Sequence, residues 1–335
     1  RPLILSRAGL ALRKTPMATH TAPGTTTHSH PAPPRPSAPP VADATGAPPS
    51  QGLDWAIAAT SALLVGGFWL DAWAHVFLPQ LETFFTPWHA VLYSGLLATA
   101  LVLAGAAIRG RMGGRPLARA LPDGYGLSVV GVLLFAGAGL SDMAWHTAFG
   151  IETGVDALLS PPHLLLAIGG SLTITGPLRS AWRRPRSGTS QSWTALAPAI
   201  VTLALVLSVW AGFTEYANPF ASPWPGTAPI ADWAQASGVA DLRAAVPPSV
   251  GQLLGMARIA VQTALLMGGL LFLLRRWEAP FGAAALVLTI AVGLPAAAHE
   301  QFRFIPVGLL GGLAADLMLR WPWPTERRRA PRMLA

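Results

Sequence analysis

The chain has 335 residues, of which 52% are apolar and only 11% are charged, whereas a soluble domain carries about 25% charged residues. This composition excludes a soluble globular protein and indicates an integral membrane protein in a lipid bilayer; the formal net charge of +8 comes from arginines in short loops, which favours a topological role over nucleic-acid binding. The chain contains no cysteine, which excludes disulfides, thiolate-bound metals and iron–sulfur clusters.

Residues 1–50 differ in composition from the rest of the chain. They are rich in Pro, Ala, Thr and Ser and bury too little apolar surface to order themselves, which predicts a disordered cytoplasmic tail. Its three histidines fit a flexible tail better than a metal site. The opening apolar stretch is too short for a secretory signal peptide, and the sequence leaves open whether the protein starts at Arg1 or at Met17.

Residues 51–325 are expected to form an all-α, polytopic membrane domain, followed by a basic cytoplasmic tail at 326–335. A membrane-spanning helix needs about 20 mostly apolar residues. Apolar segments predict eight such helices, over residues 54–77, 87–108, 125–147, 161–178, 193–214, 250–274, 279–298 and 304–320.

Arginines divide the connections between these spans into two sets. The connections after the second, fourth and sixth spans and the segment after the eighth contain Arg109, Arg111, Arg115, Arg119, Arg179, Arg183, Arg184, Arg186, Arg275, Arg276, Arg320, Arg327, Arg328 and Arg329. The other connections contain only Arg243 and Arg303. Because positive residues mark the cytoplasmic side, this distribution predicts a bacterial-type plasma membrane protein with both termini in the cytoplasm.

Acidic and histidine residues favour the opposite side. Those at the outer span ends or in the outer connections are Asp71, His75, Glu82, His89, Asp142, His146, Glu152, Asp156, His163, Glu215, His299 and Glu300. An ionisable group inside a membrane costs a few kcal/mol unless it is paired, metal-bound or hydrated. The grouping therefore favours a functional site near the outer face, although span ends also tolerate carboxylates without any function.

Two segments of the chain share a pattern. In the segment that begins at Trp69, Asp71 and His75 lie four residues apart, Glu82 follows, and "TPWH" ends at His89. In the segment that begins at Gly139, an equivalent Asp and His pair, a Glu and "SPPH" occur at Asp142, His146, Glu152 and His163. This repetition predicts a duplicated helix pair.

The spacing has a chemical meaning. Residues four apart lie on one face of a helix, so each Asp and His pair, with the histidine that opens the next helix, forms a three-ligand set. Such nitrogen and oxygen ligands suit copper, zinc or iron. Glu82 and Glu152 are expected either to orient the imidazoles or to carry protons. The proline before each histidine also fits an ordinary helix start, but the repetition favours two metal sites.

At these residues, over 69–170, the chain resembles the C subunit of the copper membrane monooxygenases, the particulate methane and ammonia monooxygenases. The family's Asp-x-x-x-His pair and Phe-Thr-Pro-x-His element match Asp71, His75 and His89, within "FFTPWH". Its later Asn-x-x-x-His pair and His-Thr-x-Phe-x-x-Glu run match Asp142 and "HTAFGIE". In the family, the second copper position also uses the histidine that maps to His89, and the further Pro-x-His maps to His163.

The resemblance implies bound copper, an association with other membrane subunits, and oxidation of a small apolar substrate that arrives through the lipid. Asp142 departs from the family, which has asparagine there, and adds a negative charge. No segment of this chain resembles the soluble copper-binding domain of the partner subunits. The resemblance therefore supports shared metal binding more strongly than shared oxygenase activity, and whether the protein is an enzyme stays open.

Two other hypotheses remain. The first is a metal-handling or proton-handling membrane protein without redox chemistry, because paired acidic and histidine residues also form ion pathways. Against it, Arg258 and Asp316 are nearly the only ionisable residues in the inner halves of the spans. The second is bis-histidine haem ligation, which gives the repeated aspartates no role. His299 is expected to be a hydrogen-bonded structural histidine rather than a ligand.

Overall fold

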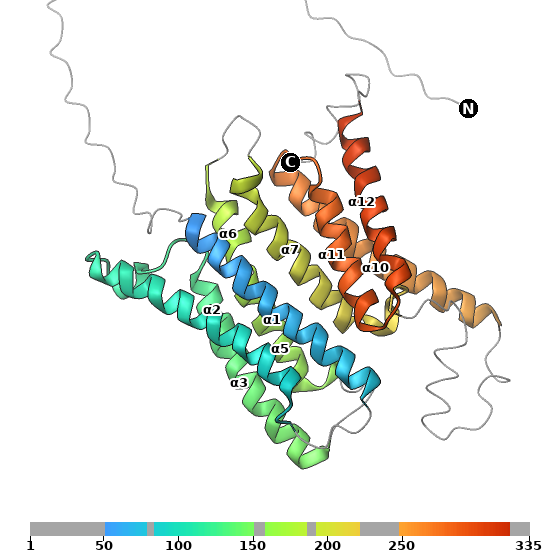
Figure 1. Ribbon diagram of the computed structural model, residues 1–335, viewed down its shortest axis with the longest axis horizontal. Coiled ribbons are helices and arrows are strands. Elements are labelled where there is room, and N and C mark those ends of the chain that lie inside the picture. The colour runs from blue at the N-terminus through green and yellow to red at the C-terminus, as the bar shows by residue number, and fades with distance from the viewer. Residues whose placement is uncertain (1–50, 79–83, 151–157, 186–191, 222–247, 322–335) are drawn as a thin grey trace, which may run out of the picture. The chain divides into compact units, whose positions relative to one another are not determined.

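The computed structural model describes residues 51–78, 84–150, 158–185, 192–221 and 248–321, and these contain helices and no strand. Figure 1 shows the arrangement of the longer helices. They are α1 (Gln51–Phe77), α2 (Pro87–Met112), α3 (Gly126–Phe149), α5 (Pro161–Ile174), α6 (Gly176–Arg183), α7 (Trp193–Phe213), α10 (Pro248–Arg276), α11 (Ala283–Ala298) and α12 (Ile305–Arg320). Three short 3₁₀ turns, η1 (Leu117–Arg119), η2 (Glu215–Ala217) and η3 (Phe302–Phe304), join some of them. The predicted all-helical fold is confirmed, and the tails at 1–50 and 326–335 lie outside the described residues.

Six of these helices are long and apolar enough to cross a membrane, namely α1, α2, α3, α7, α10 and the segment Phe302–Arg320 that includes α12. The other two predicted spans correspond to α5 and α11, which have 14 and 16 residues where a full crossing needs about 20. Eight spans are therefore not confirmed, although each predicted apolar segment contains a helix. The chain is an integral membrane protein by the length and composition of its helices.

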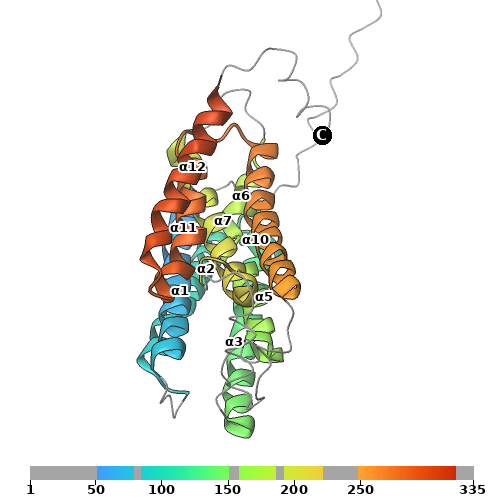
Figure 2. The ribbon, with the colours of Figure 1, turned by 90° about the vertical axis from the view of Figure 1, so that its right-hand side faces the viewer.

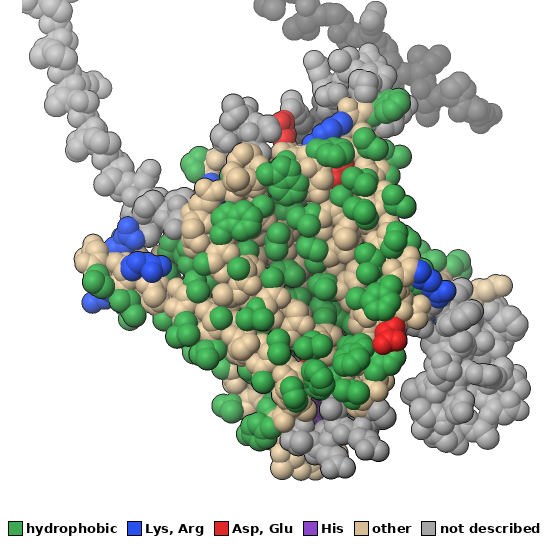
Figure 3. Space-filling view, in the orientation of Figure 1, with side chains coloured by type: hydrophobic (Ala, Val, Ile, Leu, Met, Phe, Trp, Pro, Cys, Tyr) green, Lys and Arg blue, Asp and Glu red, His purple; other side chains and the backbone are tan. Residues whose placement is uncertain are grey.

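The helices expose apolar side chains where a soluble protein exposes charge. Leu101, Leu133, Leu271 and Leu310 are each more than 60% exposed, and green apolar side chains are spread across the face in Figure 3, with few charged ones among them. In lipid such exposure carries no hydrophobic penalty. The apolar surface is therefore the expected contact with the bilayer.

The helices that carry the predicted ligands form two close pairs. α1 packs against α2, and α3 packs against α5. A Cβ at Gly95 of α2 would lie 2.4 Å from the backbone nitrogen of Leu64, and one at Gly169 of α5 would lie 2.7 Å from that of Phe135. Only glycine permits such approach, as is common between membrane helices. Each pair thus holds its two helix backbones in contact.

The most enclosed helix is α7, which contacts α1, α5, α6, α10 and α11. Nearly all of its side chains after Ala195 are buried, so it needs no polar face. Figure 2 shows α10 and α12 at opposite edges of this part of the protein. The packing around α7 holds the ligand-bearing pairs against the remaining helices.

Candidate metal centre

The first cluster consists of Asp71, His75 and His89, which the structure brings together as the spacing predicts. Asp71 and His75 lie one turn apart near the end of α1, and Oδ2 of Asp71 lies 3.7 Å from Nε2 of His75. His89 comes from the start of α2, with its Nε2 at 3.4 Å from the same oxygen. Thr86 caps this helix by accepting a hydrogen bond from the His89 backbone N–H, and Pro87 occupies the first turn. The cap and the proline fix the start of α2, and therefore the position of His89 in the cluster.

The second cluster consists of Asp142, His146 and His163, and it repeats this geometry at the end of α3 and the start of α5. Oδ1 of Asp142 lies 3.4 Å from Nε2 of His146 and 3.5 Å from Nε2 of His163. Pro161 occupies the first turn of α5, after Ser160 at the N-cap position. Both predicted three-residue sets therefore assemble from neighbouring helix ends.

The histidine tautomers follow from contacts on the other side of the rings. Nδ1 of His89 lies 2.7 Å from the carbonyl oxygen of Phe84, and Nδ1 of His146 lies 3.2 Å from that of Gly150. A carbonyl oxygen only accepts, so both Nδ1 atoms must carry the proton. Nδ1 of His163 contacts Ser160 Oγ at 2.9 Å, and a hydroxyl can donate or accept, so this contact does not select a tautomer. In the neutral rings, Nε2 of His89 and His146 therefore presents a lone pair to the carboxylate.

A cation is the simplest way to satisfy this arrangement. In each cluster at least one imidazole lone pair, on Nε2 of His89 or of His146, faces the carboxylate oxygen, and the two repel each other unless a proton or a metal ion lies between them. Oδ1 of Asp71 and Oδ1 of Asp142 are also buried without a hydrogen-bond partner among the described residues, which is costly for a carboxylate. Metal bonds of about 2.0–2.2 Å hold neighbouring ligand atoms about 3–4 Å apart. The distances from the carboxylate oxygen to the two imidazole nitrogens lie in this range in both clusters, and all the ligand atoms of a cluster lie within 4.8 Å of one another. Their donor sets thus fit a nitrogen- and oxygen-ligated ion.

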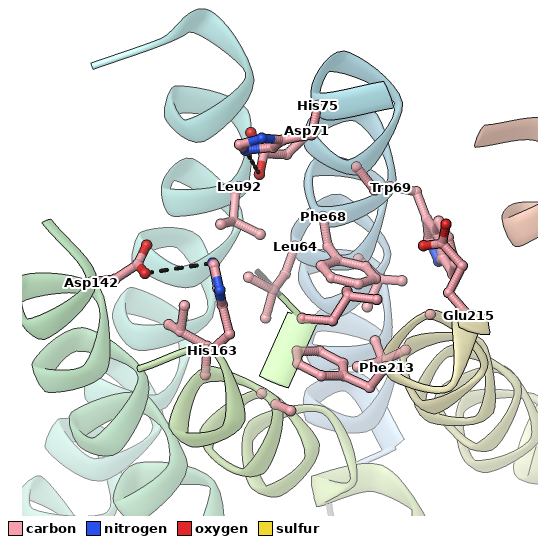
Figure 4. A pocket seen from close by; sticks show the side chains of 18 of the residues that line it. Leu64, Phe68, Trp69, Asp71, His75, Leu92, Asp142, His163, Phe213 and Glu215 are labelled. Atoms are coloured by element: carbon pink, nitrogen blue, oxygen red, sulfur yellow. Dashed lines mark ion pairs between the residues drawn. The ribbon is translucent and has the colours of Figure 1, made fainter. Parts of the chain in front are cut away.

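Both clusters line one cavity of about 320 Å³. Figure 4 shows Asp71 and His75 on one side, and Asp142 with His163 on another. The rest of the wall is mostly apolar and includes Leu64, Phe68, Leu92, Phe135, Leu166 and Phe213. The cavity therefore combines two candidate metal centres with space suited to a small apolar molecule.

Glu215 of η2 also lines this cavity. Its Oε1 lies 2.6 Å from Nε2 of His299, whose Nδ1 lies 2.9 Å from the carbonyl oxygen of Pro295. Burial alone would lower the pKa of His299, but the hydrogen bond and charge of Glu215, with the Pro295 carbonyl, outweigh it and raise the pKa. His299 is thus a hydrogen-bonded histidine, as expected.

The structure places two aromatic residues beside the clusters that the sequence does not identify. The ring of Phe84 stacks on His89 with 4.7 Å between centroids and lies 6.5 Å from His146. Tyr93, one turn after His89, lines the cavity. The phenylalanine of the Phe-Thr-Pro-x-His element is Phe85, so no motif includes Phe84 or Tyr93, and only their closeness to His89 in the sequence could have pointed to them. The predicted supporting residues Glu82 and Glu152 lie outside the described residues.

No family model, no curated protein and no solved structure matches this chain. The resemblance to the copper monooxygenase subunit therefore rests on the two short segments alone. The two assembled clusters support metal binding without relying on that resemblance.

Proposed function

We propose that this chain is a membrane metalloprotein with two metal centres, one in each cluster, that open into a common cavity. The observation that carries the proposal is the pair of carboxylates, the partly buried Asp71 and the buried Asp142, each facing two imidazole Nε2 atoms at 3.4–3.7 Å. Two matched sets on separate helix pairs favour selection for a ligand over a chance grouping of polar side chains. They also support the hypothesis that the helix pair is duplicated.

Copper is the metal that we propose, with zinc and iron as alternatives. Imidazole and carboxylate ligands without sulfur suit each of these ions. Three protein ligands also leave room for a further ligand, as in catalytic metal sites. The fixed Nδ1 partners of His89 and His146 are the kind of support that metal-bound histidines have.

We further propose that the chain acts as, or within, a copper-dependent monooxygenase of small apolar substrates. Copper would supply the redox chemistry, while this chain's residues hold the metal and enclose the substrate. Phe68, Phe135 and Phe213 give the cavity an apolar wall, and lipid concentrates apolar molecules around the protein. By the same resemblance, other membrane subunits are expected to complete the assembly.

Arginine distribution supports the proposed orientation, with both termini in the cytoplasm of a bacterial-type plasma membrane and the centres near the outer face. In the first helix pair, the ligands lie at the end of α1 and the start of α2, whereas Arg109 and Arg111 lie in the last turn of α2. In the second pair, Asp142 and His146 lie near the end of α3, away from its start.

A second candidate function is metal or proton handling without redox chemistry. The hydrogen bond between Glu215 and His299 at the cavity favours it, because such pairs exchange protons readily. Uptake that is lost in Asp71→Asn and Asp142→Asn, in a protein without oxidase activity, would place this function first.

Metal analysis of protein purified in native-like lipid tests the main proposal. Wild type should bind two ions per chain, and His89→Ala and His163→Ala should each lose one. His299→Ala is the matched control, because His299 lies outside both clusters and should leave metal content unchanged. Equal copper, zinc and iron contents in wild type and His89→Ala would refute the first centre.

A further inference from the structure

The side chain of Tyr93 lies between the helices that carry the two clusters. Its ring centroid lies 6.3 Å from that of His89 in the first cluster and 6.1 Å from that of Phe135 on α3. The phenol therefore extends from α2, which carries one cluster, toward the helix that carries the other.

The hydroxyl of Tyr93 lies against the backbone of α3 at Gly139. A Cβ at Gly139 would be 2.3 Å from this oxygen, so glycine is needed for the phenol to fit. Gly139 is one helical turn before Asp142. The phenol thus has His89 of the first cluster on one side and the turn of α3 before Asp142 on the other.

Among the described residues, no group explains why this ring carries a hydroxyl. The Tyr93 oxygen makes no hydrogen bond within these residues, and phenylalanine would fill the same space between Phe84 and Phe135. A phenol is a good hydrogen-bond donor, and Tyr93 borders the cavity. The donor is thus available to a molecule inside the cavity.

The charge expected in the cavity selects the kind of molecule. Each cluster supplies one carboxylate and two neutral imidazoles, so a divalent ion leaves one positive charge in excess at each centre. Of the other charged residues that line the cavity, Glu215 is hydrogen-bonded to His299, and Arg258 adds positive charge. Two cationic centres in a medium of low dielectric attract a small anion strongly.

We propose that Tyr93 is a ligand-binding residue whose hydroxyl donates a hydrogen bond to a small anion held between the two metal centres. The inference rests on the proposed function, since the anion needs the metal charge. Hydroxide and small inorganic anions share the required chemistry, namely a compact negative acceptor.

Azide is a suitable probe, because its charge-transfer absorption with Cu(II) reports binding and its infrared stretch reports hydrogen bonding. Copper-loaded wild type and Tyr93→Phe are titrated with azide after their copper contents have been measured. The variant should keep its copper, bind azide about tenfold more weakly, as the loss of one hydrogen bond to a charged acceptor predicts, and show a shifted azide stretch. Tyr216→Phe is the control, because Tyr216 also lines the cavity but belongs to η2.

The outcomes separate the two proposals. Full copper content with the same azide affinity and stretch in Tyr93→Phe and wild type would overturn this inference and leave the metal centres standing. Loss of copper in Tyr93→Phe would also overturn it, since the hydroxyl would then act on the metal ligands. A wild type without bound metal would overturn the proposed function, and the inference with it.

Discussion

Oδ1 of Asp142 lies 3.5 Å from Nε2 of His163, across the contact between α3 and α5. The pair shows that each cluster depends on two helices, because neither α3 nor α5 contains all three ligands. Metal binding and the packing of the helix pair should therefore affect each other, because an ion that joins the helices stabilises the folded protein by an amount that increases with the logarithm of its affinity.

Asp142→Asn should weaken divalent metal binding at the second cluster by at least tenfold, because the substitution removes the only negative ligand of that cluster. Losses of 10–100-fold already follow from changes to groups that merely support a ligand. Competition titration with a chelator of known affinity measures the effect, and Asp71→Asn should weaken the other site to a similar extent. Unchanged affinities in both variants would show that the carboxylates do not bind metal.

Gly67→Ala should destabilise the α1–α2 pair by about 1–3 kcal/mol, the usual cost of overpacking. A Cβ at Gly67 would lie 2.5 Å from the backbone of Leu92, whereas one at the adjacent Gly66 meets nothing within 4 Å. Gly66→Ala is thus a matched control that should be neutral or slightly stabilising, because alanine favours helix over glycine. Thermal unfolding in detergent compares the two, and equal melting temperatures would contradict the close packing of α1 and α2.

Much of this architecture follows from the sequence because it depends on local signals. Apolar length predicts each helix, and Thr86 and Pro87 mark the start of α2. The i,i+4 spacing of Asp71 and His75 predicts that they share a helix face, and the repetition predicts the partner from the next helix. These features need no knowledge of tertiary packing.

Other features depend on contacts between segments distant in sequence. The hydrogen bond between Glu215 and His299 joins η2 to the residue that follows α11, and nothing in the sequence near either residue identifies its partner. The position of Tyr93 against Gly139 likewise depends on how α2 meets α3. Apolar composition also fails to separate a full span from a shorter buried helix such as α5, because both consist of the same residues.

Tyr125→Phe should lower the free energy of unfolding by about 1–2 kcal/mol without changing metal content. The Tyr125 hydroxyl donates to Asp54 Oδ1 at 2.5 Å, and Arg184 pairs with the other oxygen of this buried carboxylate. Burial raises the pKa of Tyr125, so the phenol stays protonated and donates at any ordinary pH. Chemical denaturation of Tyr125→Phe and of the exposed control Tyr216→Phe tests the contribution, and equal stability of the two would show that the bond contributes nothing.

The Glu215 and His299 pair should make stability depend on pH. The pKa of His299 is raised in the folded protein from an ordinary value near 6.5, so its stabilisation is complete below pH 6.5 and is lost as pH rises through the folded pKa. Glu215→Gln removes the charge that raises the pKa. Metal-free wild type should therefore melt above Glu215→Gln at pH 6, and the difference should shrink toward pH 9.

The histidines of the two clusters are present in wild type and in each variant, so their contribution to the pH dependence cancels when the melting temperatures are compared. Glu300→Gln is the control, because Glu300 is the residue next to His299 but contacts Trp73 at 3.5 Å instead of the imidazole. Its melting curve should follow wild type at every pH. A Glu215→Gln curve parallel to wild type between pH 6 and pH 9 would mean that the carboxylate does not hold a proton on His299, and would also remove the support that this pair gives to a proton-handling function.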